Sequence, residues 1–385
     1  MMDLRLCVPC LFGLEGLAAD ELRRLELEQV SAENGRVFFT GGPEAIARAN
    51  LSLRTGERVL LELGSFPCLS FEALFEGVRA LPWERFLHKD AAFPVTGHCV
   101  DSRLFSVSDC QRIIKKAVAE RLRAQYGLSW FPETGAVHQI RFFLMKDRAS
   151  ICLDTSGEGL HKRGYRPAHN AAPLRETLAA AMVLLSRYKG RGELCDPFCG
   201  SGTIPIEAAL IALNRAPGLG RSFAAMAWPE LDGGIWQLAR EEARDREYRG
   251  AYRISGGDID PKAVEIARAN AQRAGVEEYV SFRQADAMAF SRSTERGVLI
   301  TNPPYGERLG EKQQAEELYR GFGRALSACE GWQLYLLSSH PDFERCFGRQ
   351  ADKKRKLYNG MIKCDLYMYY KKAPGSESPR REKKS

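Results

Sequence analysis

The chain has 385 residues, of which 44% are hydrophobic, and a formal net charge of +7. This length predicts two or three domains, each with enough apolar residues for a core of its own. No run of about 18 uncharged apolar residues occurs, and the first residues lack a secretory signal. These features argue against a membrane-spanning or secreted protein, and we expect a soluble, cytoplasmic one.

The eleven cysteines are an odd number in a chain too long to need disulfide bridges, which predicts reduced thiols. Cys7 and Cys10 have the spacing of a metal or redox pair. No second pair or histidine follows at zinc-site spacing, so we expect a coincidence at the start of a strand and no metal.

The positive charge is concentrated at one end of the chain. Residues 353–385 contain eleven Lys and Arg against three acids, a net of +8, which leaves −1 for residues 1–352. A basic end is suited to contact with phosphates, although it is also typical of a solvated tail.

Residues 1–64 are predicted to form a small α+β domain. Their apolar spacing indicates strand, helix, strand, strand, helix, strand, which is a ferredoxin-like order. Nothing in this segment has the pattern of a catalytic site.

Residues 65–155 predict a second α+β segment, with a helix at 71–81, a strand at 93–100 and a helix at 108–122. One side of the last helix is apolar and another is cationic. A cationic stripe lies well along a phosphate backbone, but it is also typical of an ordinary solvated face. The candidate RNA contacts here are Arg103, Arg112, Lys115 and Lys116.

Residues 156–172 have the composition of a linker, because they contain glycines and a proline and lack an apolar period. They also contain cations and an aromatic ring that would contact phosphates and stack on a base. These candidate RNA contacts are Lys162, Arg163, Tyr165 and Arg166.

Residues 173–372 alternate strands with helices, which predicts an α/β domain with a parallel, doubly wound sheet and a ligand at the carboxyl ends of its strands. A helix is expected from 173 to 185, and two final strands at 353–358 and 362–370. Residues 373–385 have the composition of a basic, disordered tail.

A glycine loop, residues 196–202, follows the first strand of that domain. The third glycine of a nicotinamide fingerprint is replaced by Pro205, so a dinucleotide is not expected. Asp196 would repel a pyrophosphate and attract the ammonium and sulfonium of S-adenosylmethionine. The alternative is an ordinary corner between strand and helix in which the aspartate is a cap.

Three further strand ends carry polar residues, and a parallel sheet brings them to the same edge. Asp258 is suited to the two hydroxyls of a ribose, Ile259 to one face of an adenine, and Asp286 to the adenine amino group. Aspartates at strand ends are also common helix caps, and that reading stays open for Asp258 and Asp286.

The sequence Asn302-Pro303-Pro304-Tyr305 follows the fourth strand. Its two prolines fix the backbone and remove two N–H donors. The side-chain oxygen of Asn302 and the carbonyl of Pro303 would accept both protons of an exocyclic amine, while Tyr305 would stack on an extruded base. The alternative is a plain turn.

These motifs, with Gly257-Asp258-Ile259-Asp260-Pro261, resemble the class I Rossmann-fold amino-methyltransferases. Residues 161–166 and 172–177 resemble the linker and entry helix of THUMP-domain RNA guanine-N2 methyltransferases, and 93–111 resembles their THUMP segment. The similarity covers residues 1–372 and is greatest to the guanine-N2 half of bacterial 23S rRNA methyltransferases.

The resemblance implies that the N-terminal domains bind RNA and that the Rossmann domain methylates a guanine with S-adenosylmethionine. It implies that Asn302, Pro303, Pro304 and Tyr305 present the base and that Thr177 lies near the methionine end of the cofactor. The other implied cofactor residues are Asp196, Pro197, Phe198, Gly200, Gly202, Asp258, Ile259 and Asp286. Some relatives continue into a second methyltransferase domain, so a second methylation activity is not expected here.

The expected substrate is a guanine N2 amine in 23S rRNA. A tRNA guanine or an adenine N6 amine fits the same chemistry, because Asn-Pro-Pro-Tyr serves any exocyclic amine. An RNA-binding module with a vestigial cofactor site is a further alternative, although the intact Asp196, Asp258 and Asn302 argue against it. A thiolation enzyme would need a pyrophosphate-binding loop and a relay cysteine, and we identify neither.

Overall fold

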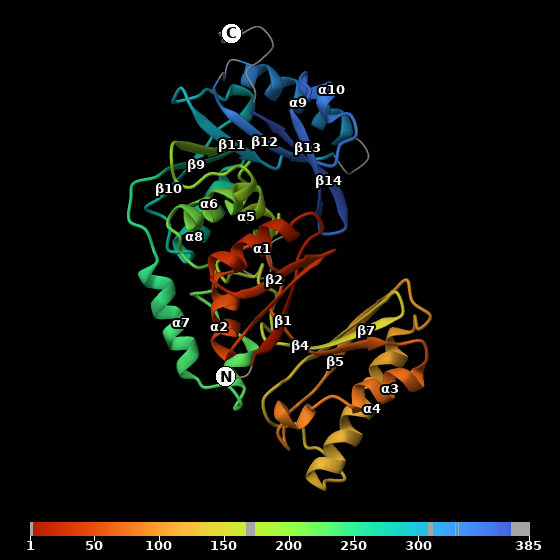
Figure 1. The fold of residues 1–385 in the computed structure, drawn as a ribbon. Coiled ribbons are helices and arrows are strands. Elements are labelled where there is room, and N and C mark those ends of the chain that lie inside the picture. The colour runs from red at the N-terminus through yellow and green to blue at the C-terminus, as the bar shows by residue number, and fades with distance from the viewer. Residues whose placement is uncertain (1–2, 167–173, 307–310, 328, 330, 371–385) are drawn as a thin grey trace, which may run out of the picture. The chain divides into compact units, whose positions relative to one another are not determined.

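The computed structural model describes residues 3–166, 174–306, 311–327, 329 and 331–370. The chain divides into two compact units: Met1–Arg163 with Ala216–Arg246, and Gly164–Arg215 with Glu247–Ser385. Each unit is built on a seven-stranded sheet of its own (Figure 1).

The first part of the N-terminal unit has the ferredoxin-like order predicted from its apolar spacing. Its elements are β1 (Leu4–Pro9), α1 (Glu15–Arg24), β2 (Glu28–Glu33), β3 (Arg36–Gly41), α2 (Pro43–Ser52) and β4 (Leu60–Pro67). Pro43 begins α2, where its missing N–H costs no helical hydrogen bond.

The second part of this unit continues the same sheet. Its elements are α3 (Phe71–Arg79), the short 3-10 helix η1 (Trp83–Arg85), β5 (Val95–Val100), α4 (Val107–Tyr126), β6 (Ile140–Met145) and β7 (Arg148–Asp154). The strand order is β2-β3-β1-β4-β7-β6-β5, and β4 pairs with β1 on one side and β7 on the other. The two predicted α+β segments therefore share one sheet, and a boundary at residue 64 falls inside β4.

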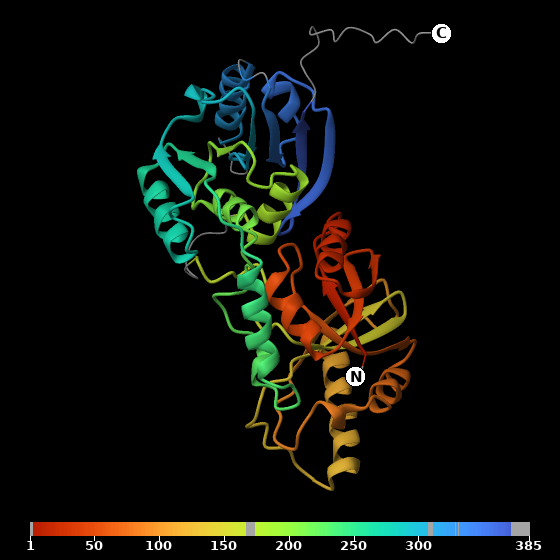
Figure 2. The same cartoon turned by 60° about the vertical axis from the view of Figure 1, so that its left-hand side comes forward.

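Residues 216–246 belong to the N-terminal unit, although the sequence pattern assigned them to the domain at 173–372. They contain the 3-10 helix η2 (Ala224–Ala227) and the helix α7 (Gly234–Asp245). Helix α7 lies beside α2 (Figure 2), where Arg48 Nη2 donates to Glu242 Oε1 at 2.9 Å.

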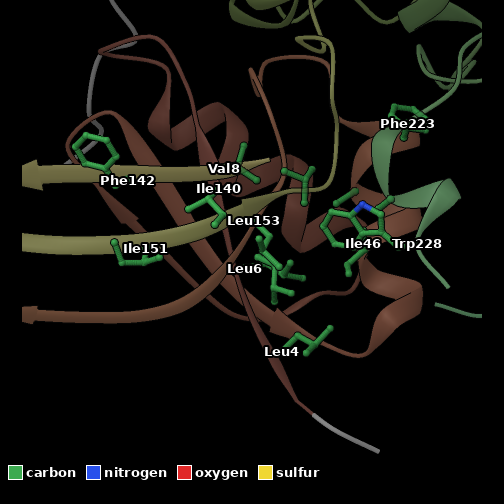
Figure 3. Close-up of a cluster of buried hydrophobic side chains, with 14 of the residues drawn as sticks. Leu4, Leu6, Val8, Ile46, Ile140, Phe142, Ile151, Leu153, Phe223 and Trp228 are labelled. Atoms are coloured by element: carbon green, nitrogen blue, oxygen red, sulfur yellow. The ribbon is translucent and has the colours of Figure 1, made fainter. Parts of the chain in front are cut away.

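The core of the N-terminal unit joins its sheet, α2 and the 216–246 segment. Leu6 on β1 and Ile46 on α2 are fully buried, and Trp228 is 2% exposed (Figure 3). Trp228 stacks on His138, with ring centroids 4.5 Å apart, and its indole N–H donates to the carbonyl of Val137 at 3.0 Å. A buried tryptophan with its polar atom satisfied holds the segment to this core.

The C-terminal unit has the predicted doubly wound sheet, with strand order β10-β9-β8-β11-β12-β14-β13. Its strands are β8 (Glu193–Asp196), β9 (Arg253–Asp258), β10 (Val280–Gln284), β11 (Gly297–Thr301), β12 (Gln333–Ser338), β13 (Lys353–Asn359) and β14 (Ile362–Tyr369). Strand β14 is antiparallel to both of its neighbours, β12 and β13, and the other pairings in this sheet are parallel. The two predicted final strands are therefore a hairpin at the sheet edge.

The connections between these strands are mostly helical. They are α6 (Thr203–Ala212), α8 (Pro261–Arg273), the 3-10 helix η3 (Ala287–Ala289), α9 (Glu311–Ser327) and α10 (Phe343–Phe347). Helix α5 (Glu176–Leu185) precedes the first strand, β8. The predicted first turn at Pro173 and the predicted tail at 373–385 lie outside the described residues.

Candidate active site

The sheet order brings the predicted polar strand ends to one edge. Strands β10, β9, β8 and β11 are direct neighbours and parallel, so their carboxyl ends lie side by side. Asp196 and Asp258 are the last residues of β8 and β9, Asp286 follows β10 by two residues, and Asn302 follows β11 directly. The clustering expected from a parallel sheet is present.

The glycine loop between β8 and α6 is fastened to β9. The N–H of Cys199 donates to the carbonyl of Gly257 at 2.9 Å, and the N–H of Gly200 donates to Asp258 Oδ2 at 2.9 Å. Gly202 has a φ of +83°, and a Cβ there would come within 2.9 Å of the Phe282 ring. The conformation and the space both require glycine at this position.

Asp196 lies beneath this loop, which corrects the expectation that it attracts the cofactor directly. It is 1% exposed, and its Oδ1 accepts from the N–H of Phe198 at 3.1 Å and from Thr301 Oγ1 at 2.6 Å. Burial raises its pKa to about 7. These two hydrogen bonds hold its side chain between the loop and Thr301, the last residue of β11, and thereby tie two strand ends together.

A cavity of about 630 Å³ opens at this edge of the sheet, a size suited to a nucleoside-sized ligand. Six of the predicted cofactor residues line it: Pro197, Phe198, Gly200, Asp258, Ile259 and Asp286. Of the other three, Thr177 and Asp196 are buried, and Gly202 packs against Phe282 instead. The cavity also includes Asn302, Pro303, Pro304 and Tyr305, so the two predicted parts of the site form one space.

The cavity contains groups that fit S-adenosylmethionine. Asp258 accepts one backbone N–H on each oxygen, from Gly200 and Asp260, which leaves lone pairs on a partly exposed carboxylate for two ribose hydroxyls. Ile259 is 66% exposed and lines the cavity next to Asp258, so its side chain is accessible to an apolar ring there. Asp286 caps η3, as the alternative interpretation expected, and it still lines the cavity.

Hydrogen bonds fix the Asn-Pro-Pro-Tyr segment. The Tyr319 hydroxyl donates to the carbonyl of Pro304 at 2.6 Å, and the Tyr305 hydroxyl donates to Asn302 Oδ1. Burial raises the pKa of Tyr305 far above its usual value, so the hydroxyl remains protonated. The Asn302 oxygen has a second lone pair for another donor.

Seven residues of the cavity were not identified as site residues from the sequence. Ala287 and Gly306 directly follow the predicted Asp286 and Tyr305, and the other five are more remote. Leu174 precedes α5, Met288 lies in η3 and Leu318 in α9, while Asn359 and Ile362 flank the turn of the β13–β14 hairpin. The hairpin residues are more than 50 positions from Tyr305 in the chain. The sequence predicted only that two final strands exist. It did not predict the strand order that places the hairpin residues at the cavity.

The candidate RNA contacts on the N-terminal unit are exposed but mostly paired. Arg112 pairs with Asp109, Lys115 with Glu133 at 2.8 Å, and Lys116 with Glu120 at 3.9 Å. Arg103 lies 3.8 Å from Asp147 with 71% of its side chain exposed. The cationic stripe on α4 is therefore real but partly neutralised by neighbouring carboxylates.

Three of the four candidate contacts in the predicted linker are structural instead, which corrects that expectation. Arg163 is 5% exposed and donates to the carbonyls of Arg54 and Leu160. Tyr165 is 3% exposed and donates to Glu207, so no base has access to its ring. Arg166 pairs with Glu176 at 2.7 Å. Only Lys162 is exposed, and it pairs with Glu158.

Three family models match the chain in succession. The RlmL ferredoxin-like domain matches residues 5–60, the THUMP domain 68–154, and the RMKL-like methyltransferase domain 163–368. The last model covers more than half of the chain. The chain belongs to the RMKL-like methyltransferase family. The resemblance inferred from the motifs is confirmed.

Relatives agree with this assignment. The chain is 45% identical over 374 residues to the putative RNA methyltransferase YpsC of Bacillus subtilis, covering 96% of each chain. It is 38% identical to the ribosomal RNA large subunit methyltransferase K/L of Psychromonas ingrahamii, covering 94% of this chain and 49% of that protein. This chain thus spans about half the length of that second relative.

A solved structure described as a putative methyltransferase complexed with SAH is 42% identical, with a TM-score of 0.91, and the match covers 97% of this chain and 99% of that one. This relative and the methyltransferase family support the S-adenosylmethionine cofactor expected from the sequence. In the described part of the chain, no group of three or more His, Cys, Asp or Glu is placed to hold a metal ion. Nor does any described helix have the length and apolarity to cross a membrane.

Proposed function

We propose that this RMKL-like methyltransferase transfers a methyl group from S-adenosylmethionine to the N2 amine of a guanine in 23S rRNA. The observation that carries the proposal is one cavity lined both by Asp258 and Ile259 and by Asn302-Pro303-Pro304-Tyr305. A nucleoside cofactor and an exocyclic amine would meet in that space.

The cofactor would be held along the ends of β9 and β10. We assign the ribose hydroxyls to the Asp258 carboxylate, one adenine face to Ile259, and the adenine amino group to Asp286. The glycine loop would approach the ligand closely, since a Cβ at Gly200 would have no atom within 4 Å. S-adenosylmethionine supplies an electrophilic methyl group when it is bound.

The Asn-Pro-Pro-Tyr segment would position the amine. Asn302 Oδ1 and the Pro303 carbonyl accept hydrogen bonds from the two N–H groups of the amine, which draws the nitrogen lone pair out of conjugation with the ring. Tyr305 stacks on the extruded base. The surplus proton on the methylated nitrogen passes to water. Because the leaving group is a neutral thioether, positioning accounts for most of the rate and no strong general base is required.

RNA as the substrate is supported by the THUMP domain and by the rRNA methyltransferase relative. Five cations remain the proposed contacts of the N-terminal unit and linker: Arg103, Arg112, Lys115, Lys116 and Lys162. All eleven cysteines are free thiols, which is consistent with our proposal that the protein acts in the cytoplasm.

The test is the transfer of labelled methyl groups from S-adenosylmethionine to rRNA and tRNA that are purified separately from a strain lacking this protein. Nucleoside analysis then identifies the product. We expect label as N2-methylguanosine in 23S rRNA. Label in tRNA would overturn the substrate, label in N6-methyladenosine would overturn the acceptor atom, and no label in any RNA would favour a non-catalytic RNA-binding module.

A further inference from the structure

The β13–β14 hairpin has two faces with different surroundings. Across its ladder Asn359 pairs with Ile362 and Leu357 with Cys364, and side chains of paired residues lie on the same face. Asn359 and Ile362 line the cavity, and Cys364 Sγ lies 3.6 Å from the Tyr305 hydroxyl. This face of the hairpin is a wall of the candidate active site.

The opposite face carries cations and an aromatic ring. Tyr358 pairs with Lys363, and Lys356 lies two residues away along the same strand face; all three are exposed. Residues 353–363 contain five Lys and Arg and no acid. Asp365 opposite Lys356 and Glu344 beside Lys354 offset part of this charge, which leaves the segment strongly positive.

The tip of the hairpin is a two-residue turn. Gly360 has a φ of +64°, and Met361, which follows it, is 97% exposed. Cations on an edge strand discourage pairing between molecules, and β13 is an edge strand. That explanation does not account for an exposed methionine and an exposed tyrosine, which favour association. Tyr358 and Lys363 adjoin the cavity residues Asn359 and Ile362 in the chain but lie on the other face of the hairpin. An aromatic ring among cations at such a position is typical of contact with a nucleic-acid strand that continues past the cavity.

We propose that the β13–β14 hairpin holds the RNA strand beside the target nucleotide. Lys356 and Lys363 contact its phosphates and Tyr358 stacks on a neighbouring base. Met361 fills the place that the target base leaves when it enters the cavity, which offsets part of the cost of unstacking. The proposal rests on the proposed RNA methyltransferase function and adds to it a specific RNA-binding element in the catalytic unit.

The first test reverses the charges with Lys356→Glu and Lys363→Glu together. The matched control is Lys189→Glu with Arg249→Glu, two exposed cations that precede β8 and β9 and therefore lie at the other edge of the sheet. We expect the hairpin pair to raise the KM for 23S rRNA more than about tenfold. The slope of log KM against log salt concentration should become shallower by about 2, the value for two lost phosphate contacts. The KM for S-adenosylmethionine and the melting temperature should stay unchanged in both pairs. The neutral pair Lys356→Gln with Lys363→Gln should give an intermediate effect.

The second test concerns Met361. We expect Met361→Ala to lower kcat about tenfold with the RNA KM nearly unchanged, because unstacking a base costs a few kcal/mol. Met361→Leu should restore the rate, since it replaces the lost volume. If Met361 contacts only solvent, Met361→Ala should leave kcat unchanged and Met361→Leu should have nothing to restore.

If the hairpin variants behave like the control pair, the role of the hairpin is overturned. Methylation of 23S rRNA by the wild type would still support the proposed function. If the wild type modifies a different RNA, the same variants are compared on that RNA, and equal KM and kcat values again overturn the role of the hairpin. If the wild type methylates no RNA, both proposals fail together.

Discussion

Asp196 is a buried carboxyl group at the centre of the sheet edge, and its titration is coupled to folding. Its folded-state pKa of about 7 lies above the ordinary value of 3.8, because burial penalises the charged form. The native state therefore binds a proton between about pH 4 and 7 that the unfolded chain does not. The contribution of Asp196 to the free energy of unfolding is therefore fully present below about pH 4, and it is lost as the pH rises through about 7.

We predict that Asp196→Asn removes this dependence while retaining an oxygen acceptor for Thr301. Between pH 5 and pH 8, the free energy of unfolding of the wild type should fall by about 3 kcal/mol relative to the variant. Denaturant unfolding at several pH values measures it. Parallel curves for the two proteins would mean that Asp196 does not titrate in this range.

Tyr305 combines a ring in the cavity with a hydroxyl that donates to Asn302. If the ring stacks on the base, Tyr305→Phe should retain kcat/KM within about threefold. Tyr305→Ala should lower it about 10- to 100-fold, as expected for a stacking contact of about 1–3 kcal/mol. Steady-state kinetics with 23S rRNA measures both. An equal loss in the two variants would show that the hydroxyl, and not the ring, is required.

At the scale of elements, residues 216–246 show how a segment contributes to the core of a unit that is remote from it in the chain. They separate α6 from β9 in the chain, yet their buried side chains pack in the N-terminal unit. Arg221 adds polar contacts there, donating to the carbonyls of Glu158 and Gly159 at 2.8 Å each. The segment is a structural part of that unit.

We predict that Trp228→Ala destabilises the N-terminal unit by about 3–5 kcal/mol, the usual cost of truncating a buried large aromatic residue. Hydrogen exchange should then increase in residues 216–246 and in α2. The matched control is Trp130→Ala, because Trp130 is 72% exposed, and it should change stability by less than about 0.5 kcal/mol. Equal effects of the two substitutions would contradict this account of the core.

At the scale of the whole molecule, the sequence predicts the order of elements well because that order follows from local periodicity. The ferredoxin-like order, the parallel strands and the two final strands are all present. The clustering of Asp258, Asp286 and Asn302 is also predictable, since the carboxyl ends of parallel strands share an edge.

The remaining features depend on partners that are remote in the chain. Tyr165 lies in a segment that has the composition of a linker. Its hydroxyl is nevertheless buried and donates to Glu207, 42 positions away. Asp196 is buried with a hydrogen bond from Thr301, 105 positions away, a partner that no local pattern identifies. The tryptophans of 216–246 indicate burial but do not identify the sheet that receives them.

In the proposed reaction, Asn302 presents an amine to a cofactor held in the same cavity. The most direct measurement compares the wild type with Asn302→Ala for methyl transfer to 23S rRNA and for S-adenosylmethionine affinity by calorimetry. We predict that kcat falls about 100- to 1000-fold, as expected for the loss of a positioned polar group at the reacting centre, while the Kd for S-adenosylmethionine changes less than about twofold. Undiminished methyl transfer by Asn302→Ala would contradict the account.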